Sequence, residues 1–456
     1  MKVKSLHIKD FQQFKDFELD LTYPQGHEKA GLPLDKVCII GQSGTGKTTL
    51  LKFLKEFSSV HLFEQNKVLI APEHITNIIL YPKNTSIQLF YNTKKSPARI
   101  VTIIRSPENI KTPLIIDQDL NIKVVHNSEY REIKDYAIKN IFIPAIQDAN
   151  FYELEKNIVP EDEAKHILEQ SEYFEILPNK FSFYWSLVKH NTQQFQINLI
   201  NKRNEFSKIA TNPKIGTETI VEEIKKLREW EENQINPLEQ LGEKLDSILT
   251  KFNAQIKTEV DFEDIGFIKL ETLQGTPIKG DILSTGMKQI LLTALPLYVL
   301  KPEGSVILFD EPERSLYPNI QTELVKFYQD LTTDCQFFYA THSPLIASSF
   351  EPWEIVELKF KEDGSVYREP YFEGENHVDN YFINPQYLRW DSILQRVFDL
   401  DEEGNPERTT QLMRLATLRS TLKKGKDTLS TEKKQELYTE YKKLADLLDW
   451  KYNEEN

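Results

Sequence analysis

Hydrophobic residues recur along the chain with periods that change from one region to the next. Over residues 1–60, two alternating segments precede "KVCII", a continuous apolar run typical of a buried parallel strand, and "TTLLKFLKEF", which has helical spacing. This order predicts strand, turn, strand, buried strand, glycine-rich loop and helix, a βα unit that opens an α/β layer. From about residue 62 to 146, β-branched and aromatic runs alternate with turn residues and predict an antiparallel β arm.

The pattern becomes helical between roughly residues 150 and 258. One apolar face is marked by Ile220, Ile224, Leu227, Leu238, Leu241, Leu245 and Ile248. Pro237 interrupts this face. Because proline breaks or kinks a helix interior, its position predicts a helical hairpin or a kinked lever. The number of heptads is small, which favours an ordinary helical subdomain over a long coiled coil.

Strand and helix alternation returns over residues 263–360, where "SVILFDEPE" and "QFFYATHSP" are continuous apolar runs expected in a parallel sheet. A β-hairpin is predicted across "KEDGS", with Asp363 and Gly364 in the turn. Residues 386–456 are helical and charged, with an apolar stripe formed by Leu437, Tyr441, Leu444 and Leu448. We therefore expect four parts: an N-terminal lobe (1–150), a helical insert (151–258), a C-terminal lobe (259–385) and a helical tail (386–456).

Charge and composition exclude some classes of protein. The formal net charge of −14 over 456 residues argues against a generic nucleic-acid binder and leaves room only for a local basic patch. The longest apolar stretch, around residues 290–300, is too short to span a bilayer, and the N-terminus lacks a signal-peptide core. We expect a cytoplasmic protein with no membrane partner. Cys38 and Cys335 lie in apolar runs and are expected to pack in the core.

The clearest chemical motif is "GQSGTGKT", which matches GxxxxGK(S/T) between an apolar strand and a helix. Glycines in such a loop let backbone amides surround phosphates, while Lys47 reaches the β and γ oxygens and the Thr48 hydroxyl ligates Mg²⁺. The motif predicts binding of ATP and Mg²⁺. The expected nucleotide-binding residues are Gly41, Gln42, Ser43, Gly44, Thr45, Gly46, Lys47, Thr48 and Thr49.

Two later strand ends carry groups that a phosphate loop needs. In "VILFDEPE", Asp310 would hold Mg²⁺ through water and Glu311 would polarise the attacking water. Taken alone, the pair could be two solvent-exposed carboxylates, but that alternative loses weight beside a complete loop. In "YATHSP", His342 ends the next apolar strand. A lone histidine is more often structural, yet at this position it would bond the γ-phosphate.

A second anion-binding turn is predicted in "ILSTGMKQILL", where small residues precede an apolar helix. Unpaired amides and the helix dipole favour an anion at such a turn. The predicted binding residues are Ser284, Thr285, Gly286 and Gln289.

As an ordered set, these motifs resemble an ABC-class ATPase head, and "LSTGMKQ" resembles the LSxGxxQ signature of that class. The resemblance implies a homodimer in which the signature of one chain binds the γ-phosphate held by the loop of the other. It also implies that Gln147 of "FIPAIQDANF" touches Mg²⁺ and the attacking water, that "SLYP" (315–318) is the D-loop and that His342 is the switch histidine. The match covers residues 1–60 and 263–350 and leaves the β arm and the helical insert outside.

Within that class, "DEPERSLYP" is similar to the EPExxLHP pattern of the RecF, SMC and OLD-like branch, and "LHIKDFQQFKDFELDL" resembles the opening strands of that branch. Asp10, Gln12 and Tyr317 depart from the usual residues, so nucleotide contacts by Gln12 and hydrogen bonding by Tyr317 are not carried over. After residue 350 the sequence lacks the strand–helix alternation expected of a TOPRIM nuclease domain.

The layout is similar to the ATPase components of anti-phage systems such as Septu (PtuA) and PARIS (AriA). In those families the ATPase works with a separately encoded HNH or TOPRIM nuclease and assembles beyond a dimer. The resemblance implies an ATPase whose head dimerisation regulates a partner effector in antiviral defence. Two alternatives stay open: an SMC- or RecF-like repair ATPase that clamps DNA directly, and a transporter subunit, which the D-loop and the insert argue against.

Overall fold

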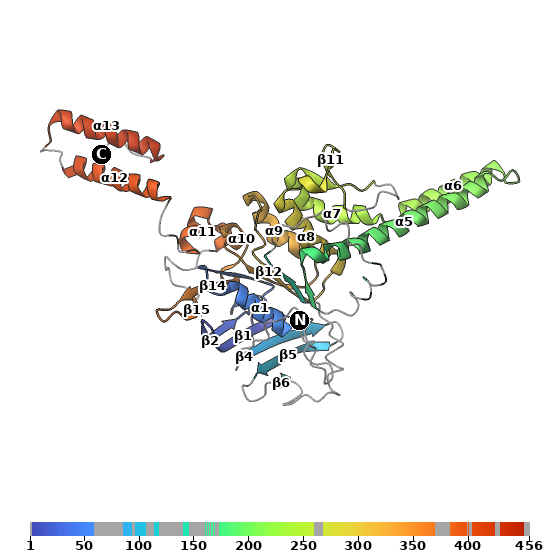
Figure 1. Cartoon of the computed structure of the whole chain (residues 1–456), viewed down its shortest axis with the longest axis horizontal. Helices are drawn as coiled ribbons and strands as arrows, with labels where there is room; N and C mark the ends of the chain where they lie inside the picture. Colours follow the sequence, from blue (N-terminus) through green and yellow to red (C-terminus); the bar gives the residue numbers. More distant parts are fainter. Residues whose placement is uncertain are drawn as a thin grey trace. The chain divides into compact units, whose positions relative to one another are not determined.

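A computed structural model gives the fold (Figure 1). The structure describes residues 2–58, 85–93, 96–105, 114–117, 140–145, 173–259, 268–369, 384–398, 404–424 and 429–450, with residues 160, 162, 164, 166, 168 and 400. Gln147 and much of the predicted β arm (62–146), including residues 121–128, lie outside these residues. The chain divides into two compact units, Met1–Tyr371 with Asn384–Gln386, and Phe372–Ile383 with Tyr387–Asn456.

The first unit contains all of the described strands. They are β1 (Lys2–Phe11), β2 (Phe14–Asp20), β3 (Lys36–Gly41), β4 (Thr85–Thr93), β5 (Ser96–Arg105), β6 (Leu114–Asp117), β7 (Asn140–Ile143), β8 (Tyr173–Glu175), β9 (Ala254–Ile256), β10 (Leu270–Thr272), β11 (Pro277–Ile278), β12 (Val306–Asp310), β13 (Gln336–Ala340), β14 (Ile355–Phe360) and β15 (Val366–Arg368). Its helices are α1 (Lys47–Ser58), α5 (Phe181–Ala210), α6 (Thr217–Glu232), α7 (Pro237–Leu249), α8 (Thr285–Leu300), α9 (Pro318–Asp330) and α10 (Pro344–Ala347).

One mixed sheet organises this unit. Among the described residues it has 12 strands in the order β6-β5-β4-β1-β2-β15-β14-β3-β13-β12-β7-β8. Strands β6, β5, β4, β1 and β2 pair antiparallel in that order, and β2 pairs parallel with β15. β15 pairs antiparallel with β14, and from β14 through β3, β13, β12 and β7 to β8 every pair is parallel. The predicted α/β fold with a mixed sheet and an antiparallel arm is confirmed. Because β3, β13 and β12 are parallel neighbours, their carboxyl ends meet at one edge.

The central strands are buried on both faces, which explains their continuous apolar sequences. On one face, Leu308 and Phe338 belong to a core that includes Leu50 and Leu54 of α1. On the other face, Phe309 of β12 contacts Tyr328 of α9, with ring centroids 4.3 Å apart. The sheet is therefore covered by α1 on one side and by α9 on the other.

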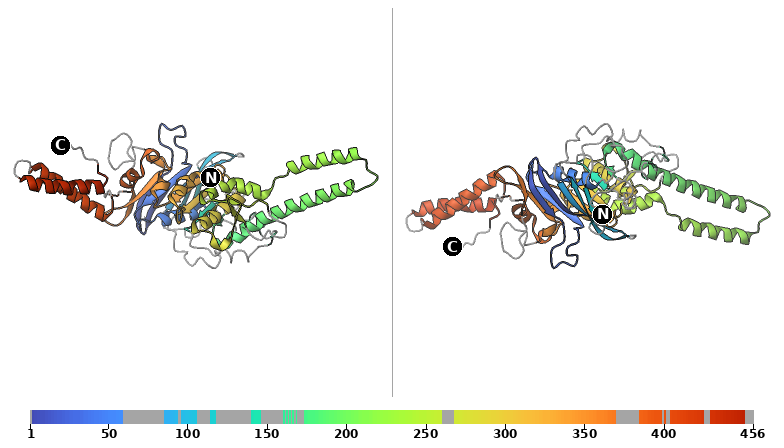
Figure 2. Two further views of the ribbon diagram at one scale, coloured as in Figure 1. Left: turned by 90° about the horizontal axis from the view of Figure 1, so that it is seen from above. Right: turned by 90° about the horizontal axis from the view of Figure 1, so that it is seen from below.

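The region predicted to be a helical insert combines helices with two short strands. β8 pairs with β7 at the end of the main sheet, and β9 joins β10 and β11 in a separate sheet. Helices α5 and α6 lie side by side as a hairpin, as the two views of Figure 2 show, and Arg203 Nε contacts Glu231 Oε1 at 2.7 Å between them. The predicted division into domains stays a prediction.

The break at Pro237 has a clear local cause. Pro237 is the first residue of α7, and Asn236 caps this helix by accepting a hydrogen bond from Leu238 N at 3.0 Å. The predicted face is buried in α7, at Leu238, Leu241, Leu245 and Ile248. The hairpin turn itself falls earlier, between α5 and α6, where the sequence analysis did not place it.

The second unit contains α11 (Trp390–Arg396), α12 (Pro406–Lys424) and α13 (Thr431–Leu447). The predicted stripe on α13 packs against α12: Tyr441 and Leu448 are buried with Leu415 and Leu418. This stripe is therefore a core face of a helical hairpin. Among the helices that the structure describes, none is long and apolar enough to cross a membrane.

Candidate functional site

The glycine-rich loop joins β3 to α1 with a backbone that only glycine adopts easily. Gly41, Gly44 and Gly46 have φ angles of 142°, 88° and 94°. A side chain at Gly46 would lie 2.5 Å from Gln13 Nε2, on the strand pair β1–β2. Sequence and packing thus agree on a tight turn whose amides line the N-terminus of a helix, the arrangement that receives phosphate groups.

Lys47 and Thr48 begin α1 and point their polar groups toward the loop and the acidic strand. Lys47 is buried, and its Nζ donates to the carbonyl oxygens of Gly41 at 2.8 Å and Gln42 at 3.2 Å. The Thr48 hydroxyl lies 3.0 Å from both carboxylate oxygens of Asp310. Two residues 262 positions apart therefore present hard oxygen atoms at one point, which is the type of ligand that Mg²⁺ prefers.

The charges around this point are partly buried, and their pKa values shift accordingly. Burial lowers the pKa of Lys47, although Glu311, Asp310 and Glu313 oppose that shift. Burial raises the pKa of Asp310, a change that the hydrogen bond from Thr48 counteracts. Lys47 therefore lies in a partly buried site under the electrostatic influence of three carboxylates. Such a site suits a strongly anionic ligand that binds together with a metal cation.

Glu311 follows β12 in a sparsely populated backbone conformation, with φ of 49°. Its amide donates to the Ala340 carbonyl at 2.8 Å, which ties the end of β12 to the end of β13. The next strand end carries His342, which is exposed, and partial desolvation of its ring together with nearby Lys47 lowers its pKa. The lowered pKa favours the neutral imidazole, which can both donate and accept a hydrogen bond.

Glu313 also belongs to this site, and the sequence analysis missed it. Its Oε1 accepts a hydrogen bond from Thr341 Oγ1 at 2.5 Å and another from His342 N at 3.1 Å. The signal in the sequence is its place as the second glutamate of "DEPERSLYP", within the segment similar to the EPExxLHP pattern, to which the sequence analysis gave no role.

The second predicted anion-binding turn precedes α8. Ser284 is the N-cap of this 16-residue helix and accepts a hydrogen bond from Met287 N at 3.2 Å. A Cβ atom at Gly286 would lie 2.6 Å from the Ser315 carbonyl oxygen, so only glycine fits there. Gln289 is buried and donates to the Pro312 carbonyl at 2.7 Å, which links α8 to the loop after Asp310 and Glu311.

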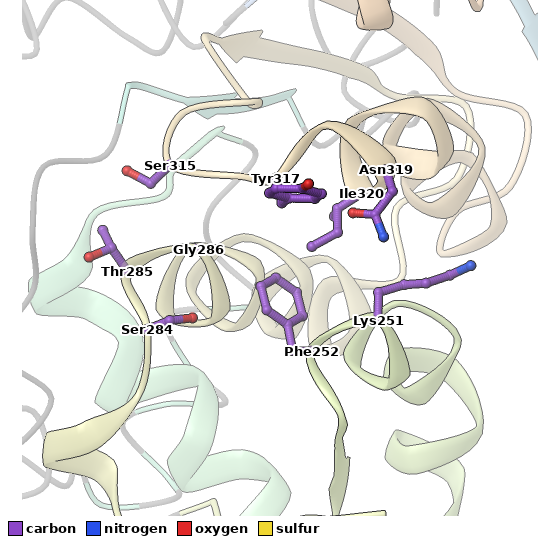
Figure 3. Close-up of a pocket in the computed structure, with 9 residues that line it drawn as sticks. All are labelled: Lys251, Phe252, Ser284, Thr285, Gly286, Ser315, Tyr317, Asn319 and Ile320. Carbon is purple, nitrogen blue, oxygen red and sulfur yellow. The ribbon is translucent and has the colours of Figure 1, made fainter.

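A pocket of about 670 Å³ opens beside this turn. Figure 3 shows Ser284 and Thr285 at one end, and the aromatic rings of Phe252 and Tyr317 facing the space from opposite sides. Its lining residues are Lys251, Phe252, Ser284, Thr285, Gly286, Ser315, Tyr317, Asn319 and Ile320. Within the described part of the chain, residues 41–49 do not line it, so the two predicted phosphate-binding turns border different spaces.

The structure thus brings together the predicted residues of the loop, the acidic strand and the switch histidine, through the contact between Thr48 and Asp310 and the electrostatic influence of Lys47 on His342. Thr45 is buried and donates to the Gln42 carbonyl at 2.8 Å, so it shapes the loop. Ser43 is exposed. The predicted role of Gln147 lies outside the described residues and stays a prediction.

Comparison with known proteins places this site in a family. Residues 1–347 match the family described as AAA ATPase domain (AAA_15). Among solved structures, the chain is similar to an Smc head domain with an extended coiled coil bound to the C-terminal domain of ScpA from Pyrococcus furiosus (14% identity, 81% of this chain and 96% of that chain, TM-score 0.43). It is also similar to the SMC head domain from Thermotoga maritima (13% identity, 82% and 100%, TM-score 0.36). No curated protein matches the chain.

Proposed function

The chain belongs to the AAA ATPase domain family, and from that premise we propose that it hydrolyses ATP, with each nucleotide enclosed between two copies of the chain. The observation that carries the proposal is the contact between Thr48 Oγ1 and both oxygens of Asp310 beside Lys47. These groups fit Mg²⁺ and a triphosphate, because they supply oxygen ligands and a buried cation together. Gln147 would add a further oxygen ligand.

The proposed division of labour follows from the strand ends. Residues 41–49 bind the phosphates, Thr48 and Asp310 hold Mg²⁺, and the metal supplies charge neutralisation of the β and γ oxygens. Glu311 orients and polarises the attacking water. His342, whose neutral form is favoured because partial desolvation and Lys47 lower its pKa, bonds the γ-phosphate oxygen and accepts or donates as the phosphate changes.

The second copy contributes Ser284, Thr285 and Gly286 of the turn before α8. Two features support this. The turn lies at the N-terminus of a 16-residue helix, where the helix dipole favours an anion, and the pocket beside it borders none of residues 41–49 in the described structure. A phosphate held by one loop would then meet the turn of the other copy, and closure of two heads would depend on ATP. A homodimer is the smallest assembly that satisfies this arrangement.

We further propose that head closure regulates a separately encoded effector, a nuclease in antiviral defence. The support is the layout of the chain, an ATPase head with a helical insert and a helical C-terminal tail, which resembles that of defence ATPases. In addition, the helical hairpin α12–α13 forms its own compact core outside the match to the ATPase family. Such a hairpin can carry a docking surface without altering the ATP site.

The alternative function is a clamp that holds DNA directly, as an SMC- or RecF-like repair ATPase. It requires a concentrated basic surface. On the α5–α6 hairpin, the basic residues Lys202, Arg203 and Lys226 pair with glutamates. This pairing weakens the case for that hairpin as a DNA surface. Binding of duplex DNA with a steep dependence on salt concentration would favour the alternative.

The test of the proposed function is Glu311→Gln. Glutamine keeps the shape of the side chain but cannot polarise water, so ATP turnover should fall by about a hundredfold or more while ATP binding is retained. Turnover is measured by phosphate release and binding with a fluorescent ATP analogue. Lys47→Ala is the matched control, because it should lose binding as well. Wild-type turnover in Glu311→Gln would contradict the assignment.

A further inference from the structure

Glu313 is a partly buried carboxylate beside the proposed ATP site, and the proposed function gives it no role. It follows Glu311 and Pro312 and reaches across to the end of the neighbouring strand β13. Its Oε1 accepts two hydrogen bonds, from Thr341 Oγ1 at 2.5 Å and from His342 N at 3.1 Å. A single oxygen atom therefore holds two consecutive residues of the segment that carries the histidine.

The Thr341 hydroxyl extends this contact to the other side of His342. Thr341 is fully buried, and its Oγ1 accepts a hydrogen bond from Ser343 N at 2.9 Å while donating to Glu313. Ser343 is in turn fixed by its hydroxyl, which donates to Gln321 Oε1 at 2.6 Å. The backbone on both sides of His342 is thus held by side-chain hydrogen bonds, whereas His342 itself is exposed.

The second oxygen of Glu313 shows whether this carboxylate suits a second general base or a residue that only positions its neighbours. Oε2 is shielded from solvent and has no hydrogen-bond partner among the described residues. Water cannot reach a shielded oxygen, so the geometry does not suit a second general base. Both hydrogen bonds fall on Oε1, and they are bonds that a neutral amide oxygen could accept equally well.

We infer that Glu313 is a positioning residue that sets the place of His342 relative to the γ-phosphate, by holding the Thr341 hydroxyl and the His342 amide. The inference rests on the proposed role of His342. Glu313 thereby links the loop after β12 to the end of β13, so a displacement of that loop would also displace the segment that carries His342. Gln289 of α8 contacts the same loop through the Pro312 carbonyl.

The test compares Glu313→Ala, Glu313→Gln, His342→Ala and the double variant Glu313→Ala/His342→Ala. Loss of the anchor should lower kcat by about tenfold or more and leave the KM for ATP within about threefold, because the histidine acts on the γ-phosphate and not on nucleotide affinity. Glu313→Gln should return kcat to within about threefold of the wild type. The double variant should be no slower than His342→Ala, since residues that act through one another are not additive.

Three outcomes would overturn the inference. Independent, multiplicative losses in the double variant would mean that Glu313 acts elsewhere. A Glu313→Gln variant as slow as Glu311→Gln would make Glu313 a charged catalytic group. A His342→Ala variant with wild-type turnover would remove the role that Glu313 supports, while ATP hydrolysis through Glu311 would still stand.

A second pair of variants covers the case in which Glu313→Ala does not fold. Thr341→Val removes the hydroxyl that bonds both Glu313 and Ser343, and Thr341→Ser keeps it. The valine variant should show the same loss of kcat at unchanged KM, and the serine variant should be close to wild type. Equal kcat values for the two Thr341 variants, with both folded as judged by thermal unfolding, would overturn the inference.

Discussion

At the scale of single residues, the site depends on backbone conformations that side chains normally avoid. Glu311 and Ser315 have positive φ angles of 49° and 60°, and each such residue costs on the order of 1–3 kcal/mol. Both lie in the loop that joins the acidic strand to α9. Strain of this kind concentrates at functional sites, where surrounding contacts hold it in place. Here those contacts include the bonds from Glu311 N to Ala340 and from Gln289 to Pro312.

Gly286 gives the sharpest prediction at this scale. In Gly286→Ala the added methyl group would meet the Ser315 carbonyl at 2.6 Å and Leu316 Cδ2 at 3.1 Å, so the turn and the loop must separate at a cost of about 1–3 kcal/mol. ATP turnover should fall by about tenfold or more, and binding of a fluorescent ATP analogue at Lys47 should persist, because the clash lies in the other pocket.

Gly216→Ala is the control, since a Cβ atom there meets nothing within 4 Å and its φ is −73°. That variant should keep wild-type turnover and stability. If Gly286→Ala turns over ATP as fast as Gly216→Ala, the close approach between the Ser284 turn and Ser315 has no part in hydrolysis.

At the scale of elements, the sequence predicts a strand best where burial alone determines its pattern of residues. β3, β12 and β13 are continuous apolar runs because helices cover both faces of the sheet, so their positions and the polar residues at their ends could be read directly. β8 could not, since a three-residue edge strand leaves almost no pattern. Glu313 could not either, because its partners Thr341 and His342 are distant in sequence and meet it only through strand order.

The tail illustrates a second limit. A stripe of Leu437, Tyr441, Leu444 and Leu448 fits a docking face and a packed face equally well from sequence alone. In the structure its partners are on α12, and α12 and α13 share a core of their own. The apolar residues left exposed in this unit are others, among them Met413, Leu447 and Trp450.

Ending the chain after residue 398 removes α12 and α13 as one unit with its own core. ATP turnover should stay within about twofold of the full chain, because the proposed site residues all lie in the first unit. Leu415→Asp in the full chain, which places a charge in the hairpin core, should behave in the same way. A folded truncated protein with less than a tenth of the wild-type turnover would mean that the hairpin takes part in the ATPase cycle.

At the scale of the whole molecule, the central claim is that one nucleotide bridges two chains. Each chain carries one phosphate loop and one Ser284 turn, and the pocket beside that turn borders none of the described residues 41–49. In the proposed dimer, the phosphate loop of each copy would face the Ser284 turn of the other copy. The two equivalent contacts would be related by a two-fold axis. Regulation of an effector would follow from this closure.

Crosslinking between two distinguishable copies tests this claim most directly. In the Glu311→Gln background, one copy carries Ser43→Cys and a tagged second copy carries Thr285→Cys; both positions are exposed, while the native Cys38 and Cys335 are buried. With ATP, a short bismaleimide should join the two different copies, and Ser284→Arg in the second copy should abolish the product. A crosslink that forms within one chain carrying both cysteines, with none between copies at saturating ATP, would contradict the account.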